Sequence, residues 1–540
     1  MAATQGEAKR VVVVGGGIAG LHSAALLARD GHDVTLLEQR SQVGGRMGTW
    51  SQDGFTFDTG PSWLLMGSVF DHAFRMLGTT MARELTVERL DPAYRVWHGE
   101  GEPIELRSDR ADSEAVFERI EPGAGAALGA YLDSARHVAD LAVGGLLYNR
   151  FDGPTSLRGT GVVGEAPTLA RLLLEPLSRR IERTVQDDRL RQILGYPAVF
   201  LGTNPYAAPS MYHLMSHFDL VEGVEYPVGG FGTIVDAFAR LAVAHGATIE
   251  TDARVTAIRV VDGRAVGVEV DRGAGTEALD ADLVVAAGDM HAVETRLLPE
   301  RFHDRGTRRW AKATPGPSAV LVLLGVEGRI PELAHHSLLF TEDWREGFKA
   351  LDGTVPWPGG DANIYVCAPS RTDATVAPEG HENLFVLVPL PADASIGHGG
   401  IDGAGDAAVE RIADDAIAQI ATWTGATDLA DRIRVRRTIG PADFAEWFDA
   451  WRGTALGPAH TLRQSAFLRG TTAYKGVDGL LTAGQSTVPG IGMPMCLISA
   501  ELVLKHVRGD RSPGPLPEPP QDPDRRGSTA APDAEAPAGA

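Results

Sequence analysis

The pattern of hydrophobic positions divides the N-terminal stretch into a strand, a helix and a second strand. Four consecutive valines, Val11 to Val14, predict a buried strand, and the mostly apolar run 21–28 predicts a helix. Residues 34–37 predict the second strand. Short apolar strands that alternate with helices are typical of a parallel sheet. This stretch therefore predicts an α/β domain.

Further elements of the same kind follow much later in the sequence. Apolar spacing predicts a helix over 233–245, and residues 248–270 alternate through the turn Asp262-Gly263, which is a hairpin signal. Short strands are predicted at 283–287 and 480–483, and a helix at 499–506. We therefore expect a discontinuous first domain that comprises residues 9–92, 224–291 and 460–508.

The stretches between these segments have a different pattern and form a second domain in this interpretation. Residues 93–223 look mostly helical. Residues 292–459 combine strand-like runs at 318–326 and 383–389 with a helix over 407–423. Together these two stretches predict a second domain that contains both helices and strands.

The turn after the first strand carries the first candidate chemistry. Gly15, Gly17 and Gly20 have the G-x-G-x-x-G spacing, which allows a tight turn, a close approach to a pyrophosphate and tight helix packing. The helix that follows directs its free N–H groups at the phosphates. Glu38 ends the second strand, where an acid binds a ribose hydroxyl. This stretch predicts a dinucleotide site.

The residues after Glu38 favour FAD over NAD. Gly44-Gly45-Arg46 forms a second glycine turn, and Phe57-Asp58-Thr59-Gly60-Pro61 follows it. A plain NAD domain has no use for a turn at this position, whereas the extended FAD molecule needs further backbone approach. Near the end of the chain, Gly484, Gly490 and Gly492 free the backbone to pass close to a flat ligand. A helix that begins there would direct N–H groups at the flavin pyrimidine and stabilise negative charge on reduced flavin.

Composition excludes several classes of protein. The chain has 540 residues, a net charge of -21 and only two cysteines, Cys367 and Cys496. This charge argues against nucleic-acid binding, and two distant cysteines form neither a disulfide framework nor a metal site. His213 with His217, and His335 with His336, could bind zinc, but we expect ordinary packed histidines and no metal.

Residues 1–8 are expected to be a disordered leader. The basic and apolar N-terminus is not a signal peptide, because its apolar run holds the phosphate-loop glycines in phase. No apolar run is long enough to cross a bilayer, so we expect no transmembrane helix. Residues 509–540 are rich in proline and poor in large apolar residues, which predicts a disordered, dispensable tail.

Residues 168–183 leave two interpretations open. Leu169, Leu172, Leu173, Leu177 and Ile181 share one helical face, and several arginines lie largely elsewhere around the helix. The helix could dip into a bilayer, or it could pack on its own core, which we favour. A proline at position 176 should kink or split it.

The separated motifs together resemble the bacterial phytoene desaturase family, within the flavin amine oxidase superfamily. The resemblance covers about residues 9–508. Besides the glycine turns, it rests on the following runs: Asp188-Arg189-Leu190, Gly202 to Pro209, Tyr226-Pro227 with Gly229-Gly230, Asp289, Gln464-Ser465-Ala466 with Arg469, and Gly484 to Glu501.

The resemblance implies a Rossmann-like FAD-binding domain of the two-dinucleotide-binding type with a discontinuous α+β substrate domain. It implies noncovalent FAD and no assigned catalytic residue; a polar pair at Arg150 and Asp152 is not fixed by spacing. The cofactor-binding residues it implies are Gly15, Gly17, Gly20, Glu38, Gly45, Arg46, Pro61, Ser62, Val255, Gly484, Gly492 and Met493.

The implied reaction is desaturation of a carotenoid precursor, most simply phytoene to neurosporene or lycopene, by hydride transfer to flavin with loss of a proton. The substrate would be a long apolar polyene drawn from a membrane surface, so we expect a cytoplasmic protein peripherally associated with the cytoplasmic membrane. The alternatives are a carotenoid ketolase, an isomerase, a later-step desaturase, an amine oxidase, or a non-catalytic prenyl-lipid carrier. No Tyr or Trp pair lies near 484–495 in the sequence, which disfavours the amine oxidase.

Overall fold

The nucleotide half of the molecule is built on a parallel sheet. In this computed structural model, residues 7–151, 156, 160–162, 164–353, 359–465 and 468–520 are described. The sheet has the order β19-β13-β1-β2-β9, with parallel pairing throughout. Its strands are β1 (Arg10–Val14), β2 (Asp33–Leu37), β9 (Thr248–Glu250), β13 (Leu283–Ala286) and β19 (Leu480–Thr482). The sheet therefore collects strands from all three predicted segments of the first domain.

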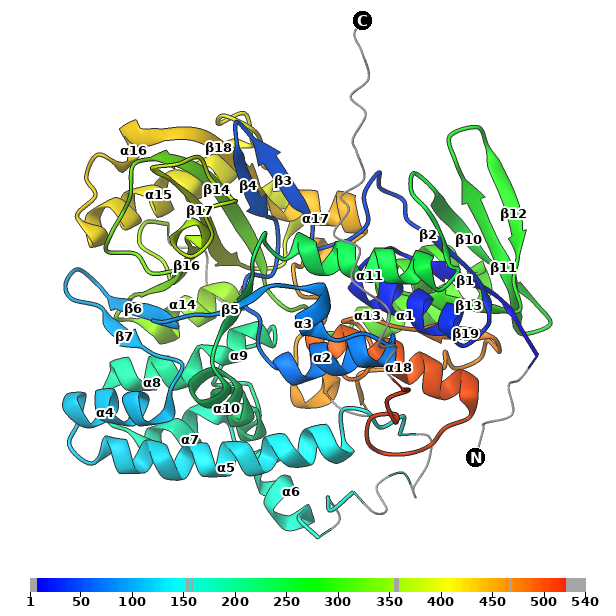
Figure 1. Cartoon of the computed structure of the whole chain (residues 1–540), viewed down its shortest axis with the longest axis horizontal. Helices are drawn as coiled ribbons and strands as arrows, with labels where there is room; N and C mark the ends of the chain where they lie inside the picture. Colours follow the sequence, from blue (N-terminus) through cyan, green and yellow to red (C-terminus); the bar gives the residue numbers. More distant parts are fainter. Residues whose placement is uncertain are drawn as a thin grey trace, which may run out of the picture.

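Three helices pack together beside this sheet (Figure 1). They are α1 (Ile18–Arg29), α11 (Gly232–Ala244) and α18 (Met493–Arg508). Almost every residue of α1 is buried, because it lies between the sheet and the two other helices. A further helix, α2 (Gly67–Met76), packs on α18. The buried helix α1 explains why its sequence is almost entirely apolar or small.

A separate three-stranded antiparallel sheet flanks the nucleotide sheet. It contains β10 (Arg254–Val261), β11 (Arg264–Asp271) and β12 (Thr276–Asp280). The turn between the first two strands is Asp262-Gly263, with positive φ at both residues, as a tight hairpin requires. The predicted hairpin is confirmed and is formed by β10 and β11. The first residues of the predicted run 248–270 form β9, which pairs with β2 in the nucleotide sheet.

The other half of the molecule is organised by a seven-stranded sheet with the order β18-β14-β17-β16-β15-β6-β7. One face packs on α15 (Ala407–Thr424) and the other continues into the main core. The strands are β6 (Tyr94–His98), β7 (Ile104–Leu106), β14 (Ser318–Glu327), β15 (His336–Phe340), β16 (Ile364–Cys367), β17 (His381–Leu390) and β18 (Ile433–Ile439). The stretch 93–223 thus adds two strands to a region that the sequence predicts as mostly helical.

Helices form the rest of this half, in the lower left of Figure 1. The described ones include α4 (Arg110–Ile120), α5 (Ala124–Gly145), α6 (Ala166–Leu174), α7 (Leu177–Thr184), α8 (Asp188–Gly195), α9 (Pro197–Phe200), the 3-10 helix η1 (Ser210–Leu214), α10 (Met215–His217) and the π-helical turn η2 (Phe218–Glu222). Shorter elements complete the chain: α3 (Met81–Glu84), α12 (Met290–Ala292), η3 (Val293–Leu297), η4 (Glu300–Phe302), α13 (His303–Trp310), α14 (Trp344–Leu351), η5 (Pro369–Arg371), η6 (Ala394–Ile396), α16 (Leu429–Arg432), α17 (Pro441–Phe448), η7 (Trp451–Gly453) and η8 (Leu462–Gln464), with the strand pairs β3 (Thr49–Gln52)/β4 (Phe55–Asp58) and β5 (Val87–Arg89)/β8 (Glu225–Pro227). No helix among the described residues is both long and apolar enough to cross a bilayer.

The predicted helix 168–183 is split as expected. Glu175 and Pro176 are extended, so α6 ends before them and α7 begins after them. Leu169, Leu172, Leu177 and Ile181 are buried and Leu173 is half-buried, so most of this face packs on protein. Leu174 points the other way and is 75% exposed.

The segment that follows α18 differs from the expected tail as far as Leu516. Leu516 is buried in the main core, and its N–H donates to Glu501 at 2.6 Å. The buried ammonium of Lys505 donates to the carbonyls of Ser512 (2.6 Å) and Gly514 (2.7 Å). The segment therefore supplies hydrogen-bond partners to Glu501 and Lys505, two buried charged residues of α18. Composition alone does not show this. Residues 521–540 lie outside the described part of the chain, and the domain boundaries stay a prediction.

Candidate active site

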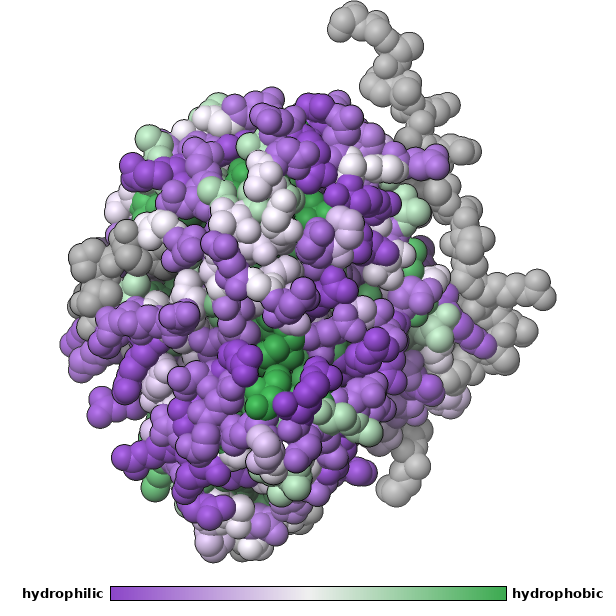
Figure 2. All heavy atoms as spheres, turned by 90° about the vertical axis from the view of Figure 1, so that its left-hand side faces the viewer, coloured by the Kyte–Doolittle hydropathy of each residue, from purple (hydrophilic) through white to green (hydrophobic). Residues whose placement is uncertain are grey.

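One large cavity connects the two halves of the molecule. Its volume is about 1250 Å³, larger than the roughly 300–1,000 Å³ of an ordinary small-molecule pocket. It extends from the glycine loops of the nucleotide sheet to the seven-stranded sheet and α14, and it also reaches α5 and α6. Figure 2 shows the side of the molecule on which α14 lies, with strongly hydrophobic atoms at the bottom of a recess ringed by hydrophilic ones. The cavity has room for a dinucleotide and for a long apolar molecule beside it.

The turn after β1 is fixed to the second glycine turn by main-chain hydrogen bonds. Gly15 has a φ of +105°, a conformation that favours glycine, and its N–H donates to the Leu37 carbonyl at 2.8 Å. The Gly44 N–H donates to the Gly16 carbonyl at 2.8 Å. The two turns, which α1 and β2 separate in the sequence, therefore form one wall of the cavity.

Gly17 and Gly20 meet different surroundings. A Cβ at Gly17 would meet no atom within 4 Å, and Gly17 lines the cavity. A Cβ at Gly20 would lie 1.9 Å from the Gly15 carbonyl oxygen, so Gly20 allows α1 to pack on the loop. Gly17 leaves open space where a pyrophosphate could approach, as the motif requires.

Glu38 lies at the carboxyl end of β2 and lines the same cavity. Its carboxylate accepts the N–H of Gly16 at 2.7 Å and the N–H of Arg40 at 2.9 Å. Because a carboxylate offers about four lone-pair sites, it can still accept a hydroxyl proton. The orientation of Glu38 suits the predicted contact with a ribose.

Arg46 brings a positive charge to this wall. Burial lowers the pKa of its guanidinium, while the negative charge of Asp289 acts in the opposite direction. Nη2 donates to the Thr454 carbonyl at 3.3 Å, and Nε has no hydrogen-bond partner among the described residues. The Gln485 side chain can also accept from Arg46 when its amide oxygen faces the guanidinium. A buried cation without a salt bridge to any described carboxylate favours an anionic ligand.

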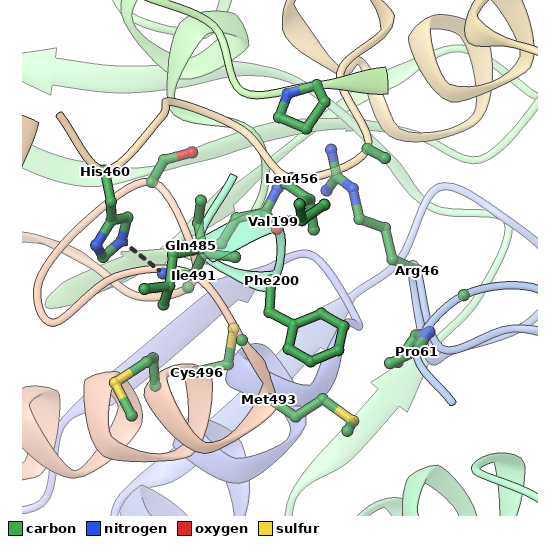
Figure 3. A pocket seen from close by; sticks show the side chains of 18 of the residues that line it. Arg46, Pro61, Val199, Phe200, Leu456, His460, Gln485, Ile491, Met493 and Cys496 are labelled. Atoms are coloured by element: carbon green, nitrogen blue, oxygen red, sulfur yellow. Dashed lines mark hydrogen bonds between the residues drawn. The ribbon is translucent and has the colours of Figure 1, made fainter. Parts of the chain in front are cut away.

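The loop 484–492 closes the cavity on the opposite side (Figure 3). The Ile491 N–H donates to Nε2 of His460 at 3.2 Å, and Nδ1 of His460 lies 2.7 Å from the Tyr212 hydroxyl. Since Nε2 accepts an N–H, the ring proton is on Nδ1 and is donated to Tyr212. Burial holds the pKa of His460 well below its ordinary value, so the ring stays neutral.

Helix α18 begins at this loop. Gly492 is its N-cap, and no side chain caps the first turn. The free N–H groups and the partial positive charge of the helix therefore remain available to a ligand in the cavity. Burial raises the pKa of the nearby Cys496 thiol to about 12, so Cys496 stays protonated. These features suit the expected flavin end of the site, and they fit Cys496 as a packed apolar residue.

The carboxylates of Asp58 and Asp289 accept backbone N–H groups and so hold neighbouring motifs in position. The Asp58 carboxylate accepts the N–H groups of Phe231 (3.0 Å) and Gly232 (3.3 Å), which joins the run 57–61 to the start of α11. Burial raises the pKa of Asp58 to about 7 despite these bonds. Asp289 accepts the His291 N–H at 2.9 Å at the start of α12. Sequence-distant motifs of the resemblance thus come together around the cavity.

Aromatic side chains form much of the second half of the cavity wall. Ring centroids of consecutive members lie between 4.9 and 6.2 Å apart. These residues, which we name the aromatic wall, are Trp63, Tyr196, Phe340, Trp344 and Phe348. They come from four segments of the chain, so hydrophobic periodicity could not reveal them. Tyr212 also reaches the loop 484–492 through His460, although no tyrosine is close to this loop in the sequence.

The structure brings together all but one of the predicted cofactor residues. Gly20 packs behind the loop, whereas the following eleven line the cavity: Gly15, Gly17, Glu38, Gly45, Arg46, Pro61, Ser62, Val255, Gly484, Gly492 and Met493. Their individual roles stay predictions. Arg150 donates to the carbonyls of Lys505 and Asp510 and is not among the lining residues, and Asp152 lies outside the described residues.

The candidate histidines divide into two groups. Both ring nitrogens of His213 have partners, Ser210 and Ser134, and Nε2 of His217 lies 3.4 Å from Glu222. His335 and His336 lie with Cys367, their potential ligand atoms all within 4.8 Å of one another. Residues on separate strands supply this cluster, because His336 pairs with Cys367 across β15 and β16. The expectation of no metal stays a prediction.

Comparison with known proteins then identifies the family. Residues 18–503 match the model of the flavin containing amine oxidoreductases. A carotenoid 3,4-desaturase from Haloarcula japonica is 40% identical over 491 residues, which cover 91% of this chain and 96% of that protein. A zeta-carotene-forming phytoene desaturase from Myxococcus xanthus is 34% identical and covers 94% and 95%.

The chain belongs to the carotenoid desaturase family of flavin-containing amine oxidoreductases. The crystal structure of an oxidoreductase from Methanosarcina mazei has the same fold, with a TM-score of 0.60, 16% identity and coverage of 92% of this chain and 100% of that one. The chain is therefore an FAD-dependent oxidoreductase with a Rossmann-like FAD-binding domain and a second, substrate domain. The open space at Gly17 and the buried Arg46 guanidinium fit FAD as its cofactor.

Proposed function

We propose that this protein desaturates an acyclic carotenoid by removing two hydrogens from adjacent carbons. One observation carries the proposal: a single apolar cavity extends from the FAD-binding loops to the aromatic wall and onward to α6. The names of the family members support it, since relatives from Haloarcula japonica and Myxococcus xanthus are called carotenoid desaturases. A long polyene would lie along this cavity with one C–C bond beside the cofactor.

When bound, FAD supplies a two-electron acceptor for hydride. The residues of this chain position the reactants and exclude water. The glycine turns and Arg46 would hold the diphosphate, and the start of α18 would face the flavin ring. The apolar lining keeps water from the reacting carbons, which favours hydride transfer over side reactions. We assign no catalytic acid or base.

The substrate proposed first is phytoene, with neurosporene or lycopene as product. A second candidate is a later step, 3,4-desaturation, because the Haloarcula japonica relative at 40% identity carries that name. A ketolase, an isomerase, an amine oxidase and a prenyl-lipid carrier would use the same cavity in other ways. The enzymatic alternatives differ in product and the carrier forms none, so product analysis separates them.

We also propose that the substrate enters from a membrane surface. Helix α6 supports this, because Leu169 and Leu173 line the cavity while Leu174 is 75% exposed on the same short helix. A long hydrocarbon does not cross water readily, since each CH₂ group left in water costs about 0.8 kcal/mol. An exposed leucine beside the cavity lining suits transfer from a bilayer.

The function is tested with FAD-loaded protein and liposomes that contain one polyene each: phytoene, neurosporene or lycopene. The products are separated by chromatography and identified by mass and visible spectrum. The proposal predicts loss of hydrogen in pairs, with phytoene converted to neurosporene or lycopene. Conversion of lycopene alone would favour the later-step desaturase, a product that contains oxygen would favour the ketolase, and binding without any product would favour the carrier.

A further inference from the structure

Asp219 is a buried carboxylate that the proposed function has not used. It lies on η2 and is 2% exposed. One of its oxygens accepts the hydroxyl of Tyr196 at 2.8 Å and the hydroxyl of Tyr94 at 2.9 Å. Among the described residues, no cation pairs with Asp219 within salt-bridge distance, and its second oxygen has no partner. An uncompensated carboxylate in the protein interior is expensive, so its position calls for a reason.

The two tyrosines belong to a cluster of rings around Trp63. The indole centroid lies 5.3 Å from Tyr94, 6.1 Å from Tyr196 and 5.4 Å from Phe200. Trp63, Tyr196 and Phe200 all line the cavity, whereas Tyr94 lies behind them. The carboxylate is therefore one hydrogen bond away from a ring that faces the substrate space.

The other groups joined to this cluster are neutral. His336 stacks on Trp63 at 4.3 Å, and burial holds the pKa of His336 well below its ordinary value. Tyr365 shares hydrogen bonds with His336 and Ser62. Among the described residues that hydrogen-bond to these rings, only Asp219 can carry a formal charge. Burial raises the pKa of Asp219 to about 7, so its carboxylate is negative above that pH, and no described member of the cluster neutralises the charge.

The cluster lies beside the expected flavin ring. Trp63 directly follows Pro61 and Ser62, two of the predicted FAD contacts. In Figure 3 the Phe200 ring lies in the space between Pro61 and Met493. The aromatic faces of this cluster therefore border the place where the reacting carbons of a bound polyene would lie.

Positive charge develops on the substrate at this place. In the reaction proposed above, an allylic C–H bond breaks and its electron pair leaves with the hydrogen, so the polyene is oxidised and the flavin reduced. The adjacent carbon then loses a proton, which passes to solvent, and the electrons of that C–H bond form the new double bond. Between these events the polyene carries a positive charge, which aromatic faces attract through their quadrupoles.

We propose that Asp219, acting through the rings of Tyr196 and Trp63, stabilises the cationic state of the polyene during desaturation. This inference rests on the proposed function. Tyr196 and Trp63 would be catalytic residues that contact the substrate, and Asp219 a positioning residue that increases electron density on the tyrosine ring. A low local dielectric makes this charge more effective than it would be in water.

The test compares two probes that bind to the FAD-loaded protein. One is squalene, a neutral hydrocarbon, and the other is an azasqualene, in which a protonated tertiary nitrogen replaces one carbon of the chain. Binding is followed by the change in the visible spectrum of the bound flavin, at a pH well above the pKa of about 7 of Asp219, so that its carboxylate is ionised. We expect the wild type to prefer the azasqualene, and Asp219→Asn to lower the ratio of the two affinities about threefold to thirtyfold. Squalene should bind both proteins equally.

Two further variants distinguish an electrostatic effect from damaged packing. Tyr196→Phe keeps the ring but removes its hydroxyl, so it should lower the same ratio even if Asp219→Asn folds poorly. Glu382→Gln neutralises another fully buried carboxylate, which lies outside the cavity lining and faces Arg329 and Arg371. This control should leave the ratio unchanged.

The outcomes separate the inference from the proposed function. If both probes bind the wild type and the ratio is the same in Asp219→Asn and Tyr196→Phe, the electrostatic role is wrong and the proposed function stands. If neither probe binds the wild type, the cavity does not accept a long isoprenoid, and the proposed function fails with the inference. A fall in kcat for phytoene with unchanged KM in Tyr196→Phe would support the inference, since only the cationic state loses stabilisation.

Discussion

The two halves of this molecule assemble their parts of the cavity in opposite ways. On the nucleotide side, the wall is main chain: Gly15, Gly17 and Gly44 allow backbone to approach a ligand, and all three lie within residues 15–44. On the substrate side, the wall is made of large side chains from distant segments, such as Trp63, Tyr196 and Trp344. The first half recognises a fixed cofactor, whereas the second encloses a substrate with few polar groups.

This difference teaches how each half tolerates change. A backbone wall leaves the space beside it to the ligand, so a side chain added at a lining glycine such as Gly17 would occupy the place of the cofactor and should have a large and specific effect. A side-chain wall can adapt its volume, and we infer that its chemistry depends on the buried carboxylate of Asp219. The following predictions test this contrast, beginning with the largest expected effect.

Gly17→Val should abolish flavin retention. The new side chain would project into the cavity, where the FAD diphosphate is expected to lie. Flavin content is measured from the visible spectrum of the purified protein. Gly144→Val is the matched control, because Gly144 is an exposed residue of helix α5 with no atom within 4 Å of an added Cβ, and this variant should keep its flavin. Full FAD content in Gly17→Val would contradict the backbone wall.

Leu172→Ala should destabilise the protein by about 2–5 kcal/mol, as large-to-small substitutions in a core do. Leu172 is 1% exposed, whereas its near neighbour Leu174 is 75% exposed. Leu174→Ser should therefore change the free energy of unfolding by less than roughly 0.5 kcal/mol. Denaturant titration of both variants measures these values.

The variant Leu174→Ser also tests the membrane proposal. Leu174→Ser should reduce co-sedimentation with liposomes without loss of flavin, because its side chain is available to a bilayer. If Leu174→Ser sediments with liposomes as the wild type does, the membrane-facing surface lies elsewhere.

A chain that ends at Gly509 should be less stable than one that ends at Pro520. The shorter chain loses two of the three carbonyls around the buried Lys505 ammonium and the buried side chain of Leu516. Leaving a buried charged donor without partners costs more than about 1–3 kcal/mol. Thermal unfolding compares the two truncations with the full chain. Equal melting temperatures for all three would show that the segment 510–518 contributes nothing, as its composition first suggests.

The smallest effect concerns pH. Burial raises the pKa of Asp219 from 3.8 to about 7 in the folded protein. The folded chain therefore keeps a proton that the unfolded chain releases, and the free energy of unfolding falls as pH rises from about 4 to about 7. Asp219→Asn should make this dependence shallower. Urea titrations at several pH values measure it, and an unchanged slope would mean that Asp219 titrates normally.

The nucleotide half was largely predictable from sequence because its signals are local. The valines of β1, the three glycines and Glu38 lie within one β-α-β unit, and the structure places all of them as expected around one turn. The start of α18 was predicted too late, at Ser499, because Pro494 and the glycines before it look like a loop; proline is tolerated in the first turn.

The substrate half was much less predictable. Strands β6 and β7 pair at the edge of a sheet whose other members all come from Ser318 onward, and no local pattern reports that pairing. The hydrogen bonds between Tyr212 and His460, and between Asp219 and Tyr196, join residues that sequence motifs do not relate. Only assembly of the fold brings these side chains together.

The most direct test of the account is a single turnover without oxygen. FAD-loaded protein is mixed with liposomes that contain phytoene, and the flavin absorption and the polyene spectrum are recorded together. We predict that the oxidised flavin band disappears while a longer conjugated polyene appears, with one double bond formed for each flavin reduced, and that Gly17→Val shows neither change. Flavin that stays oxidised in the presence of phytoene, neurosporene and lycopene alike would contradict the proposal that this protein is a carotenoid desaturase.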